Sequence, residues 1–122
     1  MQPNFDSQKP IFLVISTWLE DAILVGIYPE GEQVPSITEL ALTYNINPAT
    51  ALKGINLLVD AQILYKKRGV GMFVATGARD ILLKRRQQQF FDDYVEPLIR
   101  EAKGLQINVE ELKSMIERGY NQ

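Results

Sequence analysis

The sequence contains no cysteine and no histidine. These absences exclude disulfides, thiol nucleophiles, imidazole bases and the usual zinc and haem ligands. No apolar run approaches the roughly 20 residues of a membrane span, and the N-terminal segment lacks the basic and apolar regions of a signal peptide. We therefore expect a cytoplasmic protein that has no cofactor, no metal site and no membrane partner.

Positive charge is also scarce, because 13 Lys and Arg residues face 15 Asp and Glu residues and the net charge is −2. This balance argues mildly against nucleic acid, since compact DNA-binding domains are more often basic. The charges are distributed unevenly, however. Between Ser36 and Gly71 the acids are Glu39 and Asp60, whereas the cations are Lys53, Lys66, Lys67 and Arg68.

Two short helices are predicted in this positive segment. Ser36 and Glu39 form a capping box, which starts the first helix. Asn45 ends that helix, because Asn tolerates the left-handed conformation, and Asn47 caps a second helix over residues 48–61 that has Pro at its first position. Two helices joined by such a turn form a helix-turn-helix.

The second helix has two unlike faces. Its apolar face carries Ala51, Ile55, Leu58 and Val59, and the opposite face carries Ala49, Thr50, Lys53 and Asn56. A small, polar, singly basic face suits a major groove, but it equally suits a solvated helix. Leu52 lies at the edge of the apolar face, and we expect it to pack inward rather than to touch a thymine methyl group.

A β-hairpin is predicted directly after the second helix. The β-prone runs 63–67 and 72–75 are separated by Arg68-Gly-Val-Gly, which suits a flexible tip. Lys66, Lys67 and Arg68 place three consecutive cations there. An ordinary exposed hairpin can carry such charges, but after a helix-turn-helix they are placed to grip phosphates and to reach an adjacent minor groove.

Further helices are expected on both sides of these elements. The first opens at Pro10, stops at Gly26 and repeats apolar residues at helical spacing at Ile11, Ile15, Trp18, Leu19, Ala22 and Ile23. A long helical pattern follows Arg79, and Pro97 predicts a kink or break near Glu96. A last helix begins at a second capping box, which Asn108 and Glu111 form.

Two C-terminal helices with this much apolar surface cannot form a core alone, so their apolar faces must pack on the rest of the chain or on a second copy. A dimer is favoured, because a twofold protein matches a palindromic operator. The candidate dimerisation residues are Phe90, Phe91, Tyr94, Leu98, Leu112 and Ile116. The aromatic residues Phe90, Phe91, Tyr94 and Tyr120 are compatible with an effector pocket, although such a stripe is more often packing surface.

Residues 10–76 resemble the winged-helix DNA-binding domain of the GntR family of bacterial transcription regulators. The resemblance is carried by Pro10-Ile-Phe, Pro35-Ser-Ile-Thr-Glu-Leu-Ala, Asn47-Pro-Ala-Thr and Lys67-Arg-Gly-Val-Gly-Met-Phe-Val. The short remainder resembles the YtrA-like subfamily, whose members have two helices where relatives have a large effector domain. That resemblance implies dimerisation through this region.

The resemblance also implies which residues contact DNA. These are Ser36, Thr38, Asn47, Ala49, Thr50, Lys53, Arg68 and Gly69, to which the wing charge adds Lys66. Two positions depart from the family pattern. Thr38 stands where relatives usually have Arg, so the charge and fork of a guanidinium are missing, and Leu52 stands where Arg or a polar residue is frequent.

The sequence thus predicts a mainly α fold with a small β-hairpin. We expect a flexible arm (residues 1–9), a winged helix-turn-helix domain (10–76) and a helical dimerisation region (77–122). The predicted function is a homodimeric transcription regulator, most simply a repressor, that binds double-stranded DNA at a palindromic operator and has an unknown small-molecule effector, if any. The alternative is a winged-helix protein-interaction module without specific DNA binding. No enzyme is expected, since adjacent acids such as Asp92-Asp93 do not face one another on a helix.

Overall fold

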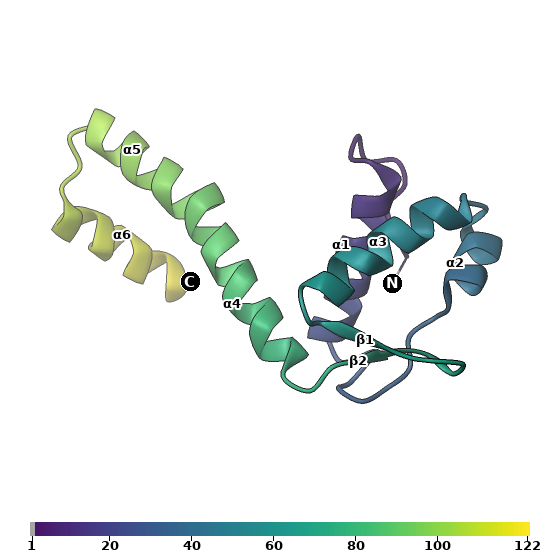
Figure 1. Cartoon of the computed structure of the whole chain (residues 1–122). Coiled ribbons are helices and arrows are strands. Elements are labelled where there is room, and N and C mark those ends of the chain that lie inside the picture. The colour runs from purple at the N-terminus through teal and green to yellow at the C-terminus, as the bar shows by residue number, and fades with distance from the viewer. Residues whose placement is uncertain (1) are drawn as a thin grey trace. The chain divides into compact units, whose positions relative to one another are not determined.

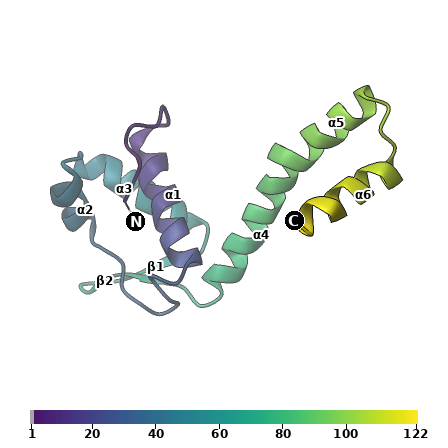
Figure 2. The same cartoon turned by 180° about the vertical axis from the view of Figure 1, so that it is seen from behind.

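The computed structural model describes residues 2–122, which divide into two compact units that meet between Lys84 and Arg85. The fold is mainly helical with one two-stranded antiparallel hairpin, as the sequence predicted (Figures 1 and 2). The elements in chain order are α1 (Ile11–Leu24), α2 (Ile37–Tyr44), α3 (Pro48–Asp60), β1 (Leu64–Lys67), β2 (Gly71–Val74), α4 (Ala78–Phe90), a π-helical turn (Phe91–Val95), α5 (Glu96–Gly104) and α6 (Val109–Tyr120).

Helix α1 buries the apolar stripe that its sequence predicted, with one exception. It ends at Leu24, and Gly26 follows with a φ of 88°, a left-handed conformation that favours glycine after a helix. Ile11, expected on the buried face, is 44% exposed and lies outside the core. Periodicity identifies the face of a helix, but it does not indicate how far along that face the partners extend.

The helix-turn-helix is closed by local hydrogen bonds. The backbone N–H of Glu39 donates to Ser36 Oγ (3.0 Å), and the backbone N–H of Ser36 donates to Glu39 Oε1 (3.2 Å), so the predicted capping box is confirmed. Helix α2 ends at Tyr44, and Asn45 follows it with a φ of 52°. Asn47 Oδ1 then accepts from the N–H of Ala49 (2.8 Å) and starts α3.

The predicted hairpin is confirmed and forms the wing, residues 64–74. Its register pairs Tyr65 with Phe73, whose rings stack with centroids 5.8 Å apart. The alternation along β1 and β2 buries Leu64, Met72 and Val74 on the other face. The wing therefore has an inner face that belongs to the core and an outer aromatic face.

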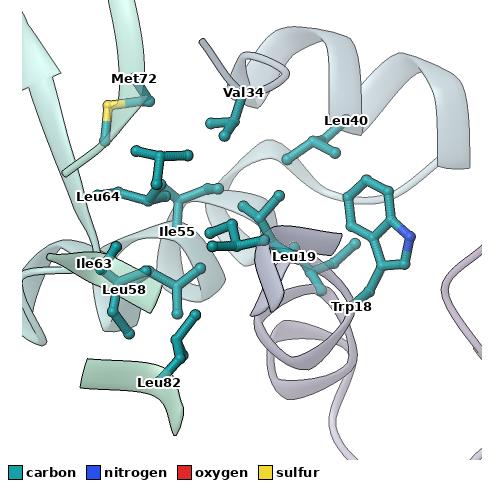
Figure 3. Packing of buried hydrophobic residues seen from close by; sticks show 14 of the residues in the cluster. Trp18, Leu19, Val34, Leu40, Ile55, Leu58, Ile63, Leu64, Met72 and Leu82 are labelled. Carbon is teal, nitrogen blue, oxygen red and sulfur yellow. The ribbon is translucent and has the colours of Figure 1, made fainter. Parts of the chain in front are cut away.

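One hydrophobic core joins α1, α2, α3, the wing and the start of α4. Figure 3 shows Leu19, Ile55 and Leu58 at its centre, with Leu82 of α4 beside them. Gly54 lets α1 and α3 approach closely, since a Cβ built on it would lie 2.7 Å from the backbone oxygen of Phe12. The loop before α2 also packs here through Val34 and Tyr28, as predicted.

A glutamate from the same loop holds the start of α4. The carboxylate of Glu30 accepts hydrogen bonds from the backbone N–H groups of Gly77 (2.7 Å) and Arg79 (3.4 Å). Arg79 Nε also donates to the backbone oxygen of Leu24 at 3.4 Å. An acceptor 47 residues away thus satisfies N–H groups that a helix start leaves without partners.

The N-terminal segment was predicted to be a flexible arm, yet it makes a defined contact. The ring of Phe5 lies against Tyr44, with centroids 5.6 Å apart, and Tyr44 in turn meets Trp18 edge-on at 5.9 Å. Phe5 therefore packs against the core. Within residues 2–122, no helix is both long and apolar enough to cross a bilayer.

The second unit, residues 85–122, is almost entirely surface. Ala102 is its single buried residue. The helical path changes at Glu96, as Pro97 predicted, and the change takes the form of the π-helical turn directly before it. Proline cannot donate to the carbonyl four residues earlier, so the preceding turn widens. The second capping box is confirmed, with Glu111 N–H donating to Asn108 Oδ1 at 2.9 Å.

Candidate nucleic-acid interface

Helix α3 presents an open face on the side away from the core. Its buried side consists of Ala51, Gly54, Ile55 and Leu58. A shallow surface groove lies on the open side and is lined by Ala49, Leu52, Lys53, Asn56, Leu57 and Asp60. The face combines small, apolar, amide and charged groups, and all six of these residues are exposed. It is the recognition surface discussed below.

Leu52 belongs to this open face, so the expectation that it packs inward is wrong. Its side chain is 42% exposed, whereas Ala51 beside it is fully buried. One residue turns a helix by about 100°, and the core that covers Ala51 does not reach around to Leu52. Periodicity placed Leu52 at the edge of the apolar face, and only packing decides on which side of the edge it lies.

The N-terminal end of α3 offers backbone and side-chain donors. Asn47 uses its Oδ1 for the cap, so its amide NH2 group is the part available to a phosphate. The positive end of the helix dipole lies at the same place. Ala49 is exposed and Thr50 is half-buried, so both contribute small groups beside the cap.

Lys53 lies on the open face, but its ammonium group leans back toward α1. Its Nζ lies 4.0 Å from the centroid of the Phe12 ring, within the range of a cation–π interaction. The charge is thus held at the border between α1 and α3. Leu52 and Asn56 are left on the outer surface of α3 beside it.

The start of α2 contributes Ser36 and Thr38. Ser36 Oγ accepts the hydrogen bond of the capping box, which leaves its own hydroxyl proton to donate. Thr38 is exposed in the first turn. Burial raises the pKa of nearby Tyr28, and the neighbours Tyr44 and Glu39 raise it further.

The tip of the wing carries the cations that the sequence predicted there. Lys66, Arg68 and Gly69 are exposed, and Gly69 has a φ of 77° in the turn. Lys67 Nζ lies 4.6 Å from the centroid of the Phe73 ring on the outer face. The side-chain amide of Gln33 donates to the backbone oxygen of Val70 at 3.0 Å and anchors the tip.

The first unit therefore collects all the predicted DNA-contacting residues at three places: the start of α2, the open side of α3 and the tip of the wing. Their contacts with DNA stay a prediction. Sequence reasoning missed the contact of Gln33 with the wing and the exposure of Leu52. It placed Asn56 on the free face without counting it as a contact, and no local signal marks Gln33, whose partner is 37 residues away.

The second unit exposes the residues that the sequence assigned to dimerisation. Phe90, Phe91, Tyr94, Leu98 and Ile116 are all exposed, and Leu112 is half-buried. The rings of Phe90 and Tyr94 lie against each other, with centroids 5.4 Å apart. Tyr120, a candidate for an effector pocket, is 87% exposed. Their role in an interface stays a prediction.

A capped helix-turn-helix followed directly by a two-stranded wing defines the winged helix-turn-helix class of DNA-binding proteins. The model of the gntR family of bacterial regulatory proteins matches residues 14–74 of the chain. The chain belongs to the GntR family and is a transcriptional regulator with a DNA-binding winged helix, as its sequence motifs predicted.

Similar proteins extend this likeness beyond the winged helix. The HTH-type transcriptional repressor YtrA of Bacillus subtilis (strain 168) is 27% identical over 111 residues, which cover 91% of this chain and 85% of YtrA. The structure of a putative GntR-family transcriptional regulator from Bacteroides thetaiotaomicron has a TM-score of 0.77 and 32% identity, and the match covers 91% of this chain and 96% of that one.

A third relative was solved with DNA. The structure of S. agalactiae BusR in complex with its busAB-promotor DNA is 29% identical, with a TM-score of 0.59. The match covers 93% of this chain but only 57% of BusR. The likeness to YtrA and to the Bacteroides protein therefore spans nearly the whole chain, including the short helical unit, whereas BusR has additional sequence.

Proposed function

We propose that the protein is a homodimeric repressor that binds a palindromic operator. In each protomer the open side of α3 enters the major groove, and the tip of the wing holds the flanking backbone or minor groove. Repression is steric, because the bound dimer covers DNA that the transcription machinery needs. We place the protein in the cytoplasm, where a bacterial chromosome lies.

The proposed DNA binding rests on one observation, which is that α3 is capped at its start and divided into a buried side and an exposed side. The helix begins with a side-chain cap and a proline, buries one side completely, and leaves Leu52, Lys53 and Asn56 exposed on the other side. The N-terminal residues of a recognition helix are those that reach base edges. BusR, which is 29% identical to this chain, was solved in complex with promoter DNA, and this supports DNA binding here.

The proposed dimerisation rests on the second unit. Its residues Phe91, Leu98 and Ile116 are exposed, and the unit buries only Ala102. Exposed apolar surface of this extent needs a partner in water. A second copy is the partner that serves DNA binding, since twofold symmetry matches two half-sites one helical turn, about 10 bp, apart. The similar protein YtrA is named a transcriptional repressor, which supports repression rather than activation.

The first test is a selection of bound fragments from random and genomic DNA by the purified full-length protein at near-physiological salt. An enriched inverted repeat is the expected result. Enrichment of single half-sites would contradict the dimer, and no enrichment by folded protein would contradict sequence-specific binding and favour the protein-interaction alternative. Transcription from the enriched promoter with and without the protein then separates repression from activation.

The oligomeric state is tested by size-exclusion chromatography with light scattering. Leu98→Glu and Ile116→Glu together are expected to convert a dimer into a monomer, because each places a charge in an apolar interface. Leu42→Glu is the matched control, since Leu42 is an exposed leucine of α2 in the first unit. A dimer that survives the double substitution would locate the interface elsewhere.

A further inference from the structure

We infer that Leu52 is a specificity-determining residue that reads the methyl group of a thymine in the major groove. The inference rests on the proposed DNA binding by α3 and adds the kind of base that this helix recognises. It starts from the exposure of Leu52, which is 42% exposed although Ala51 beside it is fully buried.

The position of Leu52 on α3 supports this role. Ala49, Leu52 and Asn56 are spaced by three and four residues, so they form one row along the open side of the helix. Ala49 is short and lets the helix come close to the bases. Leu52 is the apolar side chain of the row that projects furthest, within the N-terminal half of α3 that reaches base edges.

The charged side chain next to Leu52 does not occupy the surface that this row presents to the bases. Lys53 is drawn toward the ring of Phe12, at the border with α1. The row of Ala49, Leu52 and Asn56 is therefore left to face the floor of the groove.

The chemistry of the groove identifies the base. Leucine has no hydrogen-bond donor or acceptor, so it gains nothing from the polar edges of guanine, cytosine or adenine. The C5-methyl group of thymine is the apolar group that an unmodified base pair presents in the major groove. Asn56, one turn further along, offers the amide group that pairs with adenine. Together these side chains favour an A·T-containing half-site.

The test uses the operator obtained by selection. Each thymine is replaced singly by deoxyuridine, which removes only the C5-methyl group, and the dissociation constant is measured at fixed salt. Burial of one methyl group is worth a factor of about four, so we expect one thymine in each half-site whose replacement weakens binding about fourfold. In the Leu52→Ala protein this ratio should fall to about one, because the contact no longer exists.

Leu42→Ala is the matched control. Leu42 is an exposed leucine of α2 and lies outside the recognition surface. Leu42→Ala should keep the fourfold ratio at the same thymine. Loss of the ratio in Leu42→Ala would overturn the assignment to Leu52, and so would a Leu52→Ala protein that still distinguishes thymine from uracil.

A gain of specificity provides a second test. Leu52→Arg should move the preferred base at that position from thymine to guanine, because a guanidinium pairs with guanine O6 and N7. An enriched repeat whose thymines all tolerate uracil would overturn this inference alone. A selection that enriches no sequence would overturn the inference together with the proposed function.

Discussion

The side-chain amide of Gln33 donates a hydrogen bond to the backbone carbonyl of Val70, with 3.0 Å between Nε2 and O. Gln33 also forms an isolated β-bridge with Phe73, so the loop before α2 runs beside the wing. A Cβ at Gly71 would collide with the same side-chain amide. The tip that carries Arg68 is therefore held by a residue that belongs to the helix-turn-helix side of the domain.

Gln33→Ala tests whether this anchor matters for binding. Without the anchor the tip must become ordered when DNA binds, at a cost of about 1 kcal/mol for each residue fixed, so we expect roughly fivefold weaker binding to the selected operator. The melting temperature should change little, because the bond is exposed. Gln88→Ala removes a comparable exposed amide bond, to Asp92 in the second unit, and should leave DNA affinity unchanged. Equal affinity of Gln33→Ala and the natural protein would show that the tip needs no anchor.

The cations of the first unit are expected to act by neutralising phosphates. Lys66→Gln and Arg68→Gln should each reduce the slope of log affinity against log salt by about 1, with a similar loss for all DNA sequences. The measurement is a salt titration of binding to the operator and to unrelated DNA. Lys103→Gln makes the same charge change at an exposed lysine of α5 and should not alter the slope. An unchanged slope in the wing variants would remove the wing from the interface.

Two substitutions at Asn47 separate its cap from its proposed phosphate contact. Asn47→Ala loses the bond to the Ala49 N–H and should lower the free energy of unfolding by about 1 kcal/mol. Asn47→Asp keeps a capping oxygen and hence the stability, but it loses the NH2 donor and adds a negative charge beside the DNA. We expect more than about tenfold weaker DNA binding from Asn47→Asp. Urea denaturation and binding isotherms measure the two effects, and full affinity of Asn47→Asp would rule out the phosphate contact.

Gly54 is predicted to be required for the crossing of α1 and α3. Gly54→Ala places a methyl group against the Phe12 carbonyl, so the helices must separate, and we expect a loss of about 1–3 kcal/mol of stability. Gly119→Ala makes the same change at a helical glycine of α6 with open space around it, where the gain in helix propensity is up to about 1 kcal/mol. Thermal denaturation of both variants should show opposite signs. A stabilised Gly54→Ala protein would contradict the close packing.

Much of the fold was predictable because its signals are local. The capping boxes at Ser36 and Asn108 each join residues only three positions apart, so the sequence contains both partners side by side. Asn47 followed by proline marks the start of α3 in the same way. The hairpin follows from two β-prone runs around Gly69 and the other turn residues. These local signals were sufficient to predict the winged helix-turn-helix class.

The residues whose environment was not predictable depend on contacts between distant segments. The sequence alone determined the order of the elements, their caps and the positive character of the helix-turn-helix and wing. Only the tertiary structure decided that Leu52 is exposed, that Lys53 makes a cation–π contact with Phe12, and that Gln33 forms a hydrogen bond with the tip of the wing. The physical reason is that the exposure and the partners of a side chain depend on which neighbouring elements cover its helix. The periodicity of residues along one helix does not specify those neighbours.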